Sequence, residues 1–317
     1  MTLILPFEKP LHEIEKKIDE LVNLSQSSNI NLDDEIEKFK LQAQEFKQEL
    51  YNNLKPLDKL QIARHPNRPN FFDYVKLITD EFIELHGDRE GVDDRAIIGG
   101  VAKIGNYSVV LVGTHKGKTT KENLECNFGM PQPQGYRKAL RLFYHAQKFN
   151  FPIVTLIDTP GAFPGIKAEE TGQGIAIANN LREMAKLDVP VISVITGEGC
   201  SGGALGIGVA NRVLMLEHSY YTVISPEGCA SILWRDANYA DKAAEALKIT
   251  ADDLLNFNII DEKITEPLGG AHNDHELMGQ ALKTVILNNL QELTKMSAKD
   301  LKNDRYDKFR KMGVFLQ

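Results

Sequence analysis

VISVITGEGCSGGALGIGVANRVLML, residues 191–216, changes character within a few residues. Residues 191–195 form a β-branched apolar run that predicts a strand buried on both faces, and residues 204–209 predict a packed helix. The link between them contains four glycines: Gly197, Gly199, Gly202 and Gly203. Each glycine costs backbone entropy. The corner is therefore either sterically crowded, or it brings the backbone close to a bound molecule.

The composition is that of a globular protein with a sizeable core. Of the 317 residues, 42% are hydrophobic and 26% are charged, and the net charge of −7 argues against nucleic acid as a partner. We find neither a membrane-spanning run nor a secretory leader. Three separated cysteines without a CxxC pair argue against disulfides and a zinc ribbon, and favour a reducing compartment. We expect a cytoplasmic α/β enzyme without a metal site.

The first sixty residues predict a helical hairpin, because apolar residues recur at spacings of three and four over 11–21 and again over 32–50. Two prolines then interrupt RHPNRPNF, residues 64–71. We therefore expect residues 1–62 to be a hairpin used for packing or assembly. Residues 63–317 would form the main domain, which ends in two long helices at about 274–313.

The main domain alternates strands with helices, a pattern typical of parallel βαβ units. Strands are predicted at 96–104 and 107–113, joined by a turn at Gly105-Asn106, and at 152–158. Helices are predicted at 72–85, 134–148 and 170–187.

GTHKGKTT, residues 113–120, follows a strand and resembles a phosphate-binding loop. Its first glycine and its Gly-Lys-Thr are separated by three residues, whereas the working motif has four. The following segment is a poor amphipathic helix, so no helix N-terminus would receive a phosphate. An ATP-hydrolysing loop is disfavoured, and an exposed loop whose Lys116 or Lys118 contacts a phosphorylated ligand remains open.

GCSGG, residues 199–203, fits the nucleophile elbow of serine hydrolases. Ser201 could equally be a small residue at a crowded corner or a helix N-cap. A catalytic triad also needs a histidine and an acid. His218 is the nearest histidine in sequence, and His272 and His275 lie in an unremarkable polar stretch. A serine hydrolase and a non-catalytic scaffold organised by the hairpin therefore remain alternatives.

The same glycines can act through their backbone. Amide N–H groups at a helix N-terminus lack intrahelical partners, and glycine lets a ligand oxygen approach them closely. DTPGAFPG, residues 158–165, ends the preceding parallel strand with a second glycine-bearing turn. Ligands of open α/β sheets bind beyond the carboxyl ends of neighbouring strands. The two turns could therefore form one oxyanion hole.

Several long motifs carry a family resemblance. The motifs are LHEIEKKIDEL, RHPNRPNFFDY, LHGDR, IDTPGAFPG, AEETGQGIAIANNLREM, ITGEGCSGGALGIG and VISPEGCASILW. Over nearly the whole chain they resemble the α subunit of the carboxyltransferase of bacterial and plastid-type acetyl-CoA carboxylase. The resemblance implies a crotonase-like fold, in which stacked ββα units form two sheets wrapped by helices.

The resemblance also implies a reaction and partners. Carboxybiotin on a biotin carboxyl carrier protein would give its carboxyl group to acetyl-CoA, yielding malonyl-CoA in the first committed step of fatty acid synthesis. The freed biotin anion would serve as the base, and a separate biotin carboxylase would consume ATP. A β subunit bearing a zinc ribbon would complete an α2β2 heterotetramer in the cytoplasm or the plastid stroma.

Residue by residue, Gly202 and Gly203 match the family's biotin-side oxyanion donors, and Gly161 and Ala162 match the facing turn. Three positions depart from the family pattern: Lys167 replaces a small residue, Thr171 an arginine and Cys200 a glycine.

Other residues in these motifs are expected to have structural roles. Cys200 is expected to be a buried small side chain. Glu227 and Trp234 of SPEGCASILW are expected in structural or subunit contacts, with a catalytic Glu227 as the alternative.

Overall fold

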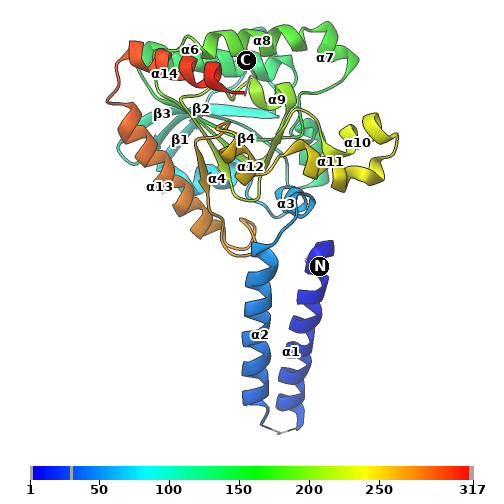
Figure 1. The fold of residues 1–317 in the computed structure, drawn as a ribbon. Helices are drawn as coiled ribbons and strands as arrows, with labels where there is room; N and C mark the ends of the chain where they lie inside the picture. The colour runs from blue at the N-terminus through cyan, green and yellow to red at the C-terminus, as the bar shows by residue number, and fades with distance from the viewer. Residues whose placement is uncertain (1–2, 29–30, 314–317) are drawn as a thin grey trace.

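The computed structural model describes residues 3–28 and 31–313, and the main body in this part of the chain is built around one eight-stranded sheet (Figure 1). Along the sheet the order is β1-β2-β3-β4-β5-β6-β8, and β7 pairs with β5 off this path. The strands are β1 (Glu81–Glu84), β2 (Ile97–Ile104), β3 (Tyr107–Thr114), β4 (Ile153–Thr159), β5 (Val191–Cys200), β6 (Arg212–Leu216), β7 (Tyr220–Thr222) and β8 (Glu262–Ile264).

The strand directions place one set of strand ends together. β1, β2 and β3 are antiparallel, and the predicted turn at Gly105 between β2 and β3 is confirmed, with φ +56°. From β3 onward, neighbouring strands are parallel. The carboxyl ends of β4 and β5 therefore lie at the same edge, where an open α/β sheet binds ligands.

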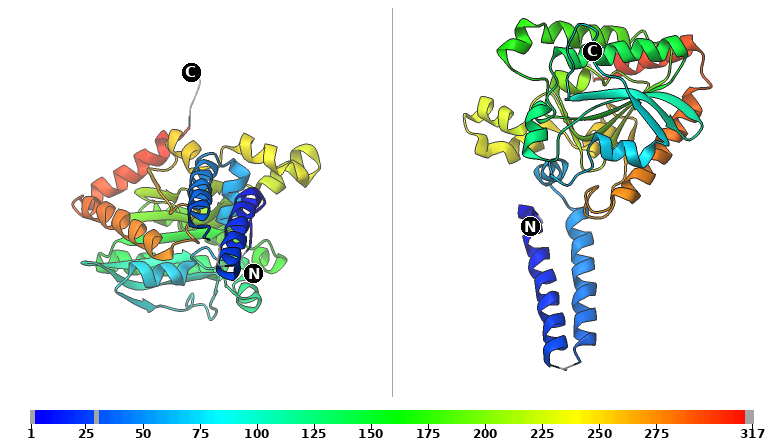
Figure 2. Two further views of the ribbon diagram at one scale, coloured as in Figure 1. Left: turned by 90° about the horizontal axis from the view of Figure 1, so that it is seen from below. Right: turned by 180° about the vertical axis from the view of Figure 1, so that it is seen from behind.

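Helices cover both faces of the sheet (Figures 1 and 2). In chain order they are α1 (Lys9–Ser28), α2 (Asp33–Asn52), α3 (Pro56–Ala63), α4 (Phe71–Ile78), α5 (Thr120–Glu125), α6 (Pro133–Phe149), α7 (Ile166–Glu170), α8 (Gln173–Met184), α9 (Ser201–Leu205), α10 (Pro226–Trp234), α11 (Ala240–Leu247), α12 (Ala251–Asn256), α13 (His275–Leu293) and α14 (Ala298–Lys311). Short 3-10 turns occupy Pro6–Glu8, Asn127–Gly129 and Ala237–Tyr239. None of the described helices combines the length and the apolar character needed to cross a bilayer.

Two apolar cores lie on opposite faces of the sheet. In β5, Val191 and Ile195 face the core formed with α6 and α8, whereas Ile192 and Val194 face the core formed with α4 and α13. Successive strand residues point to opposite faces, so a strand covered on both sides needs an unbroken apolar run. The prediction that residues 191–195 are buried on both faces is confirmed.

The predicted N-terminal hairpin is also confirmed. α1 and α2 pack along an apolar seam that includes Leu11, Ile18, Ile36 and Ala43, and the hairpin projects away from the sheet (Figures 1 and 2). The domain boundary at residue 62 stays a prediction. α3 spans it, with Leu60 in the main core.

Two helix predictions are wrong in extent. The predicted helix at 72–85 ends at Ile78, and residues 81–84 form β1, which pairs with β2. The helix predicted at 204–209 is α9, which begins at Ser201 and ends at Leu205, where Gly206 donates its N–H to the Gly202 carbonyl at 2.9 Å.

The remaining differences are smaller. The predicted helix at 170–187 begins only at Gln173, because Gly172 adopts φ +89° between α7 and α8. The two tail helices are confirmed as α13 and α14. In place of the two sheets that the resemblance implies, the strands form one hydrogen-bonded sheet. The last residues of β5 leave the main path of this sheet, because they pair with β7 and not with β6.

Candidate active site

The two glycine-bearing turns meet at the ends of β4 and β5. A Cβ atom on Gly203 would lie 2.4 Å from the carbonyl carbon of Gly161 and 2.6 Å from the amide nitrogen of Ala162. No side chain fits there, so only glycine permits this approach. Gly161 itself has φ +142°, with open space where a Cβ would be. The structure thus brings Gly161, Ala162, Gly202 and Gly203 together.

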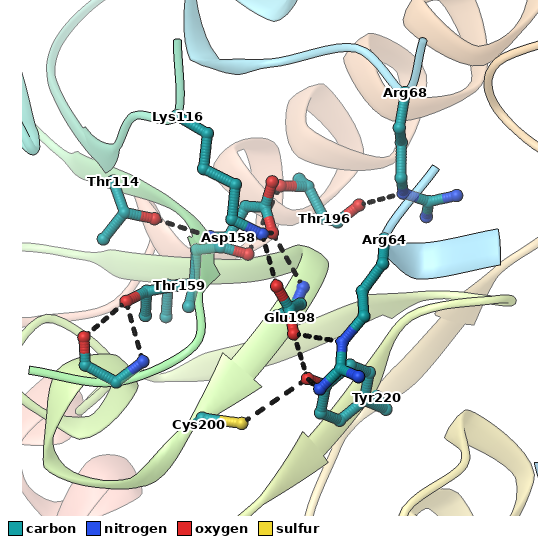
Figure 3. A network of polar contacts seen from close by, with 12 residues as sticks. Arg64, Arg68, Thr114, Lys116, Asp158, Thr159, Thr196, Glu198, Cys200 and Tyr220 are labelled. Atoms are coloured by element: carbon teal, nitrogen blue, oxygen red, sulfur yellow. Dashed lines mark hydrogen bonds and ion pairs between the residues drawn. The ribbon is translucent and has the colours of Figure 1, made fainter. Parts of the chain in front are cut away.

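The amide groups of the two turns differ in what they bond. The Gly161 N–H donates to Thr159 Oγ1 at 3.1 Å, and the Thr159 hydroxyl donates to the Gly161 carbonyl at 2.9 Å (Figure 3). Across residues 3–28 and 31–313, no acceptor bonds the N–H of Ala162, Gly202 or Gly203. Gly161 therefore shapes its turn, and the other three residues hold the free donors.

The start of α9 is held in a strained conformation. Ser201 has φ +54°, which is unfavourable for a residue with a Cβ. The Tyr136 hydroxyl donates to the Gly203 carbonyl at 3.3 Å, and the Gly206 N–H donates to the Gly202 carbonyl. The Gly202 carbonyl lies in the same peptide unit as the Gly203 N–H, so its bond to the Gly206 N–H fixes the orientation of that free donor.

A buried polar network lies beside the turns, at the carboxyl ends of the same strands (Figure 3). Its centre is Glu198, on β5. The Glu198 carboxylate accepts from Arg64 at 2.8 Å, from Lys116 at 2.7 Å and from the Tyr220 hydroxyl. Lys116 also donates to Asp158 at 2.6 Å. The network joins the loop after β3, the end of β4, the end of β5 and the residue that follows α3.

Opposite charges keep the network ionised. Burial alone would raise the pKa of the Glu198 carboxyl, but Lys116 and Arg64 outweigh it and lower that pKa to about 2. Burial would lower the pKa of the Lys116 amine, but Asp158 and Glu198 raise it above its usual value. Both groups are therefore charged at neutral pH. Neither is poised to exchange a proton with a substrate.

A pocket of about 390 Å³ opens against this network. Its lining includes Arg64, Arg68, Lys116, Asp158, Pro160 and Glu198. Pro160 directly precedes Gly161, so the pocket reaches the start of that turn, but Ala162, Gly202 and Gly203 are not among its lining residues. Lys118 also lines it; its amine lies 2.6 Å from the Asp73 carboxylate, and about half of its side chain is exposed. Of the two lysines proposed for phosphate contact, Lys118 is the more accessible.

The serine hydrolase alternative lacks its geometry. Among the described residues, no histidine ring forms a hydrogen bond with Ser201. His218 is buried, and it packs against Tyr51 at a ring-centroid distance of 6.2 Å. His272 stacks on His65 at 3.9 Å. The corner has a strained serine without a base to activate it.

The remaining candidates behave as structural groups. Cys200 is buried beside the Tyr220 hydroxyl, as expected of a buried small side chain, and burial raises the pKa of its thiol to about 11. Glu227 accepts from Arg64 at 2.6 Å. In the described residues, no cluster of three or more His, Cys, Asp or Glu side chains could hold a metal ion.

Two of the three departures from the family pattern lie on the surface. Lys167 and Thr171 are both exposed, at α7, and the Thr171 hydroxyl donates to the Lys167 carbonyl at 2.7 Å.

Sequence reasoning missed the network residues Arg64, Asp158 and Glu198 as a group. The available signal was a carboxylate within or directly after an apolar strand run, in LIDTPG and VITGEG. A buried charge needs a partner of opposite charge. The carboxylate in each of these segments therefore predicts a cation contributed by another part of the chain.

Comparison with solved structures defines the class of fold. The transcarboxylase 12S hexamer core matches with a TM-score of 0.59 and 18% identity, over 72% of this chain and 42% of that chain. A Pseudomonas malonate decarboxylase hetero-tetramer matches with a TM-score of 0.56 and 14% identity, over 67% of this chain and 85% of that one. The chain has the crotonase-like fold.

Comparison of sequences defines the family. A family model described as acetyl co-enzyme A carboxylase carboxyltransferase-like matches residues 4–313. The acetyl-coenzyme A carboxylase carboxyl transferase subunit alpha of Prochlorococcus marinus strain NATL2A is 53% identical over 314 residues, 99% of this chain and 95% of the relative. Its counterpart in Synechococcus elongatus is 53% identical over 315 residues, 99% and 96% of the two chains. The chain belongs to the acetyl-CoA carboxylase carboxyltransferase family.

Proposed function

We propose that this chain is the α subunit of the carboxyltransferase of acetyl-CoA carboxylase, which transfers a carboxyl group from carboxybiotin to acetyl-CoA and gives malonyl-CoA. The biotin would be carried on a biotin carboxyl carrier protein and charged by a separate biotin carboxylase. The single observation that carries the proposal is the contact of Gly203 with Gly161 and Ala162. It sets two strand-end turns together and leaves amide donors without an internal acceptor.

The residues present fit the proposed ligand. Gly203 has no room for a side chain, and Gly161 has open space at φ +142°, so main-chain atoms form the surface of the cradle. Bound carboxybiotin supplies the carboxyl group to be transferred and a ureido oxygen that gains negative charge as that group leaves. The N–H groups of Gly202 and Gly203 would donate to that oxygen, with Ala162 as a further donor.

This arrangement lowers a barrier without a reactive side chain. Donors already fixed in place need no reorganisation when charge develops, and removing one such donor typically costs about 10²–10³-fold in rate. The Gly202 carbonyl accepts from the Gly206 N–H, which keeps the peptide unit that carries the Gly203 N–H from turning. Burial and ion pairing hold Glu198 and Lys116 in fixed charge states, so they are not the acid or base.

The proposal includes partners. A β subunit bearing a zinc ribbon would supply the acetyl-CoA side of the site, in an α2β2 heterotetramer. Lys118 would contact a phosphate of the CoA or the carrier, whereas the Lys116 amine is already paired with Asp158 and Glu198. The compartment would be the cytoplasm, or the plastid stroma for a plastid-encoded chain. The free cysteines Cys126, Cys200 and Cys229 are consistent with a reducing environment.

Reconstitution tests the proposal. The purified chain is assayed for malonyl-CoA formation from acetyl-CoA and carboxybiotin, alone and with the β subunit. We expect no activity from the chain alone and full activity from the complex. Full activity of the chain alone would overturn the shared site, and an inactive complex would overturn the proposed reaction.

A further inference from the structure

The β4–β5 pairing contains an irregularity directly before the two turns. Ile157 pairs with Ile195 and Thr159 with Gly199, so Asp158 alone faces Thr196, Gly197 and Glu198. The Asp158 carboxylate fills this gap. Its Oδ1 accepts the Glu198 N–H at 2.9 Å, and it would lie only 2.5 Å from a Cβ on Gly197. The register of the two strand ends is thus set through one carboxylate.

Lys116 bridges the two carboxylates of this irregularity, Asp158 and Glu198. Its amine lies 2.6 Å from Asp158 Oδ1 and 2.7 Å from Glu198 Oε1, with 21% of its side chain exposed. Glu198 has Arg64 as a second cation. In the described part of the chain, Lys116 is the only ion-pair partner of Asp158. Without the Lys116 charge, the Asp158 and Glu198 carboxylates would face each other across the strand ends, and Arg64 would be the one cation left to pair with either of them.

The stem of Lys116 is also held. A Cβ on Gly129 would lie 2.6 Å from Lys116 Cγ, so the turn at residues 127–129 presses its backbone onto the lysine. That turn has positive φ at three consecutive residues: 47° at Asn127, 55° at Phe128 and 77° at Gly129. Such a conformation is costly for an aromatic residue and persists only when its surroundings impose it. Lys116 is therefore fixed at both ends.

We propose that Lys116 is a positioning residue for carboxyl transfer: by pairing with Asp158 and Glu198 it holds the ends of β4 and β5, and with them the Gly161–Ala162 and Gly202–Gly203 turns, at their contact distance. This inference rests on the proposed function and extends it. The lysine acts through the backbone and does not touch the substrate. Asp158 is followed at once by Thr159, which bonds Gly161, and Glu198 by the residues that lead into α9.

Charge repulsion predicts how removal of the Lys116 charge affects the strand ends and the rate. Like charges a few ångströms apart repel strongly where water is excluded, and the side chains of Asp158 and Glu198 are only 15% and 8% exposed. Removing the lysine charge should separate the strand ends. Because oxyanion stabilisation depends on donor position, a small displacement of the turns should lower kcat more than it raises KM for acetyl-CoA.

The test compares Lys116→Met with Lys116→Met/Asp158→Asn in the assembled complex. We expect Lys116→Met to lower kcat about 10-fold or more. The second change should recover most of it, because an amide at position 158 can still accept the Glu198 N–H and can donate to Glu198. Lys302→Met is the matched control, since Lys302 pairs at 2.7 Å with Asp188, which lies before the amino end of β5, opposite to Glu198, and it should leave kcat unchanged.

Hydrogen exchange in the free chain gives a readout that does not depend on activity. Residues 159–163 and 199–206 should exchange faster in Lys116→Met than in the wild type, and the double variant should restore their protection. A wild-type kcat in Lys116→Met, or a loss of kcat without altered exchange in these segments, would overturn the inference. An inactive wild-type complex would instead overturn the proposed function on which it rests.

Discussion

At the scale of single residues, Gly203 packs so tightly against Gly161 and Ala162 that a methyl group has no room. The atoms it would meet are backbone, which cannot turn aside as a side chain can. We therefore predict that Gly203→Ala separates the two turns and lowers carboxyl transfer about 10²-fold or more, as expected when oxyanion donors are misplaced. The measurement is the rate of malonyl-CoA formation at saturating β subunit.

Gly174 provides the control for this prediction. It lies near the start of α8, and a Cβ there would meet nothing within 4 Å. Gly174→Ala should therefore leave the rate unchanged. A Gly203→Ala complex that assembles normally and keeps the wild-type rate would show that the contact between the turns does not matter for the reaction.

The role of a single residue can be predicted from the sequence when it depends on that residue and its neighbours in the chain. The role of Gly203 follows from the absence of a side chain, and GCSGG shows that absence directly. The ion pair of Arg64 with Glu198 joins positions 134 residues apart. Nothing near Glu198 in the sequence identifies Arg64 as its partner, because folding alone brings them together.

The same distinction holds for whole elements. Residues 72–85 continue a helix-like apolar pattern past Ile78, so the pattern alone predicts a single long helix. The chain instead turns at Thr79, and β1 forms because Glu81–Glu84 find backbone partners in β2. Such a pairing is decided by residues about 20 positions away, and short apolar segments cannot be assigned by periodicity alone.

The segment between α3 and α4 is held by a buried ion pair. The Arg68 guanidinium donates to both oxygens of Glu266, at 2.8 and 2.6 Å, and also to the Thr196 carbonyl on β5. We predict that Glu266→Gln destabilises the chain by about 3–5 kcal/mol at neutral pH, because Arg68 remains buried without a counter-charge. Denaturant unfolding of both proteins measures this difference.

The same ion pair predicts a pH dependence. Burial would raise the pKa of the Glu266 carboxyl, but Arg68 lowers it to about 2 in the folded chain, against roughly 4.3 for an unfolded glutamate. Its contribution to stability is therefore complete above the unfolded value and is lost as the pH falls toward 2. The difference in the free energy of unfolding between the wild type and Glu266→Gln should therefore become smaller as the pH falls toward 2.

A half-exposed carboxylate offers the comparison for Glu266. Asp252 pairs with Lys59 at 2.8 Å and with Lys263 at 2.5 Å, and about half of its own side chain is exposed. Asp252→Asn should cost less than about 1 kcal/mol. Equal losses of stability in the Asp252 and Glu266 variants would show that burial does not decide how much each ion pair contributes.

At the scale of the whole molecule, α10 and α11 project from the side of the body (Figures 1 and 2). α10 carries large apolar side chains in water: Ile232 is 71% exposed and Leu233 64%, followed by Trp234 at 40%. Val223, in the segment that leads from β7 into α10, is 75% exposed. Apolar groups gathered in this way mark interaction surfaces. Glu227, on the same helix, bonds Arg64 and so connects this surface to the Glu198 network.

We predict that the apolar surface of α10 contacts the β subunit. Replacing Ile232 and Leu233 together by lysine should weaken assembly at least about tenfold, because burying either side chain contributes about 1.5–3 kcal/mol. Sedimentation of the mixed subunits measures this loss. Activity should return at high β-subunit concentration, because the residues of the site itself are unchanged. Tyr306→Lys, on exposed α14, should assemble as the wild type does. Wild-type affinity in the α10 variant would place the partner on another face.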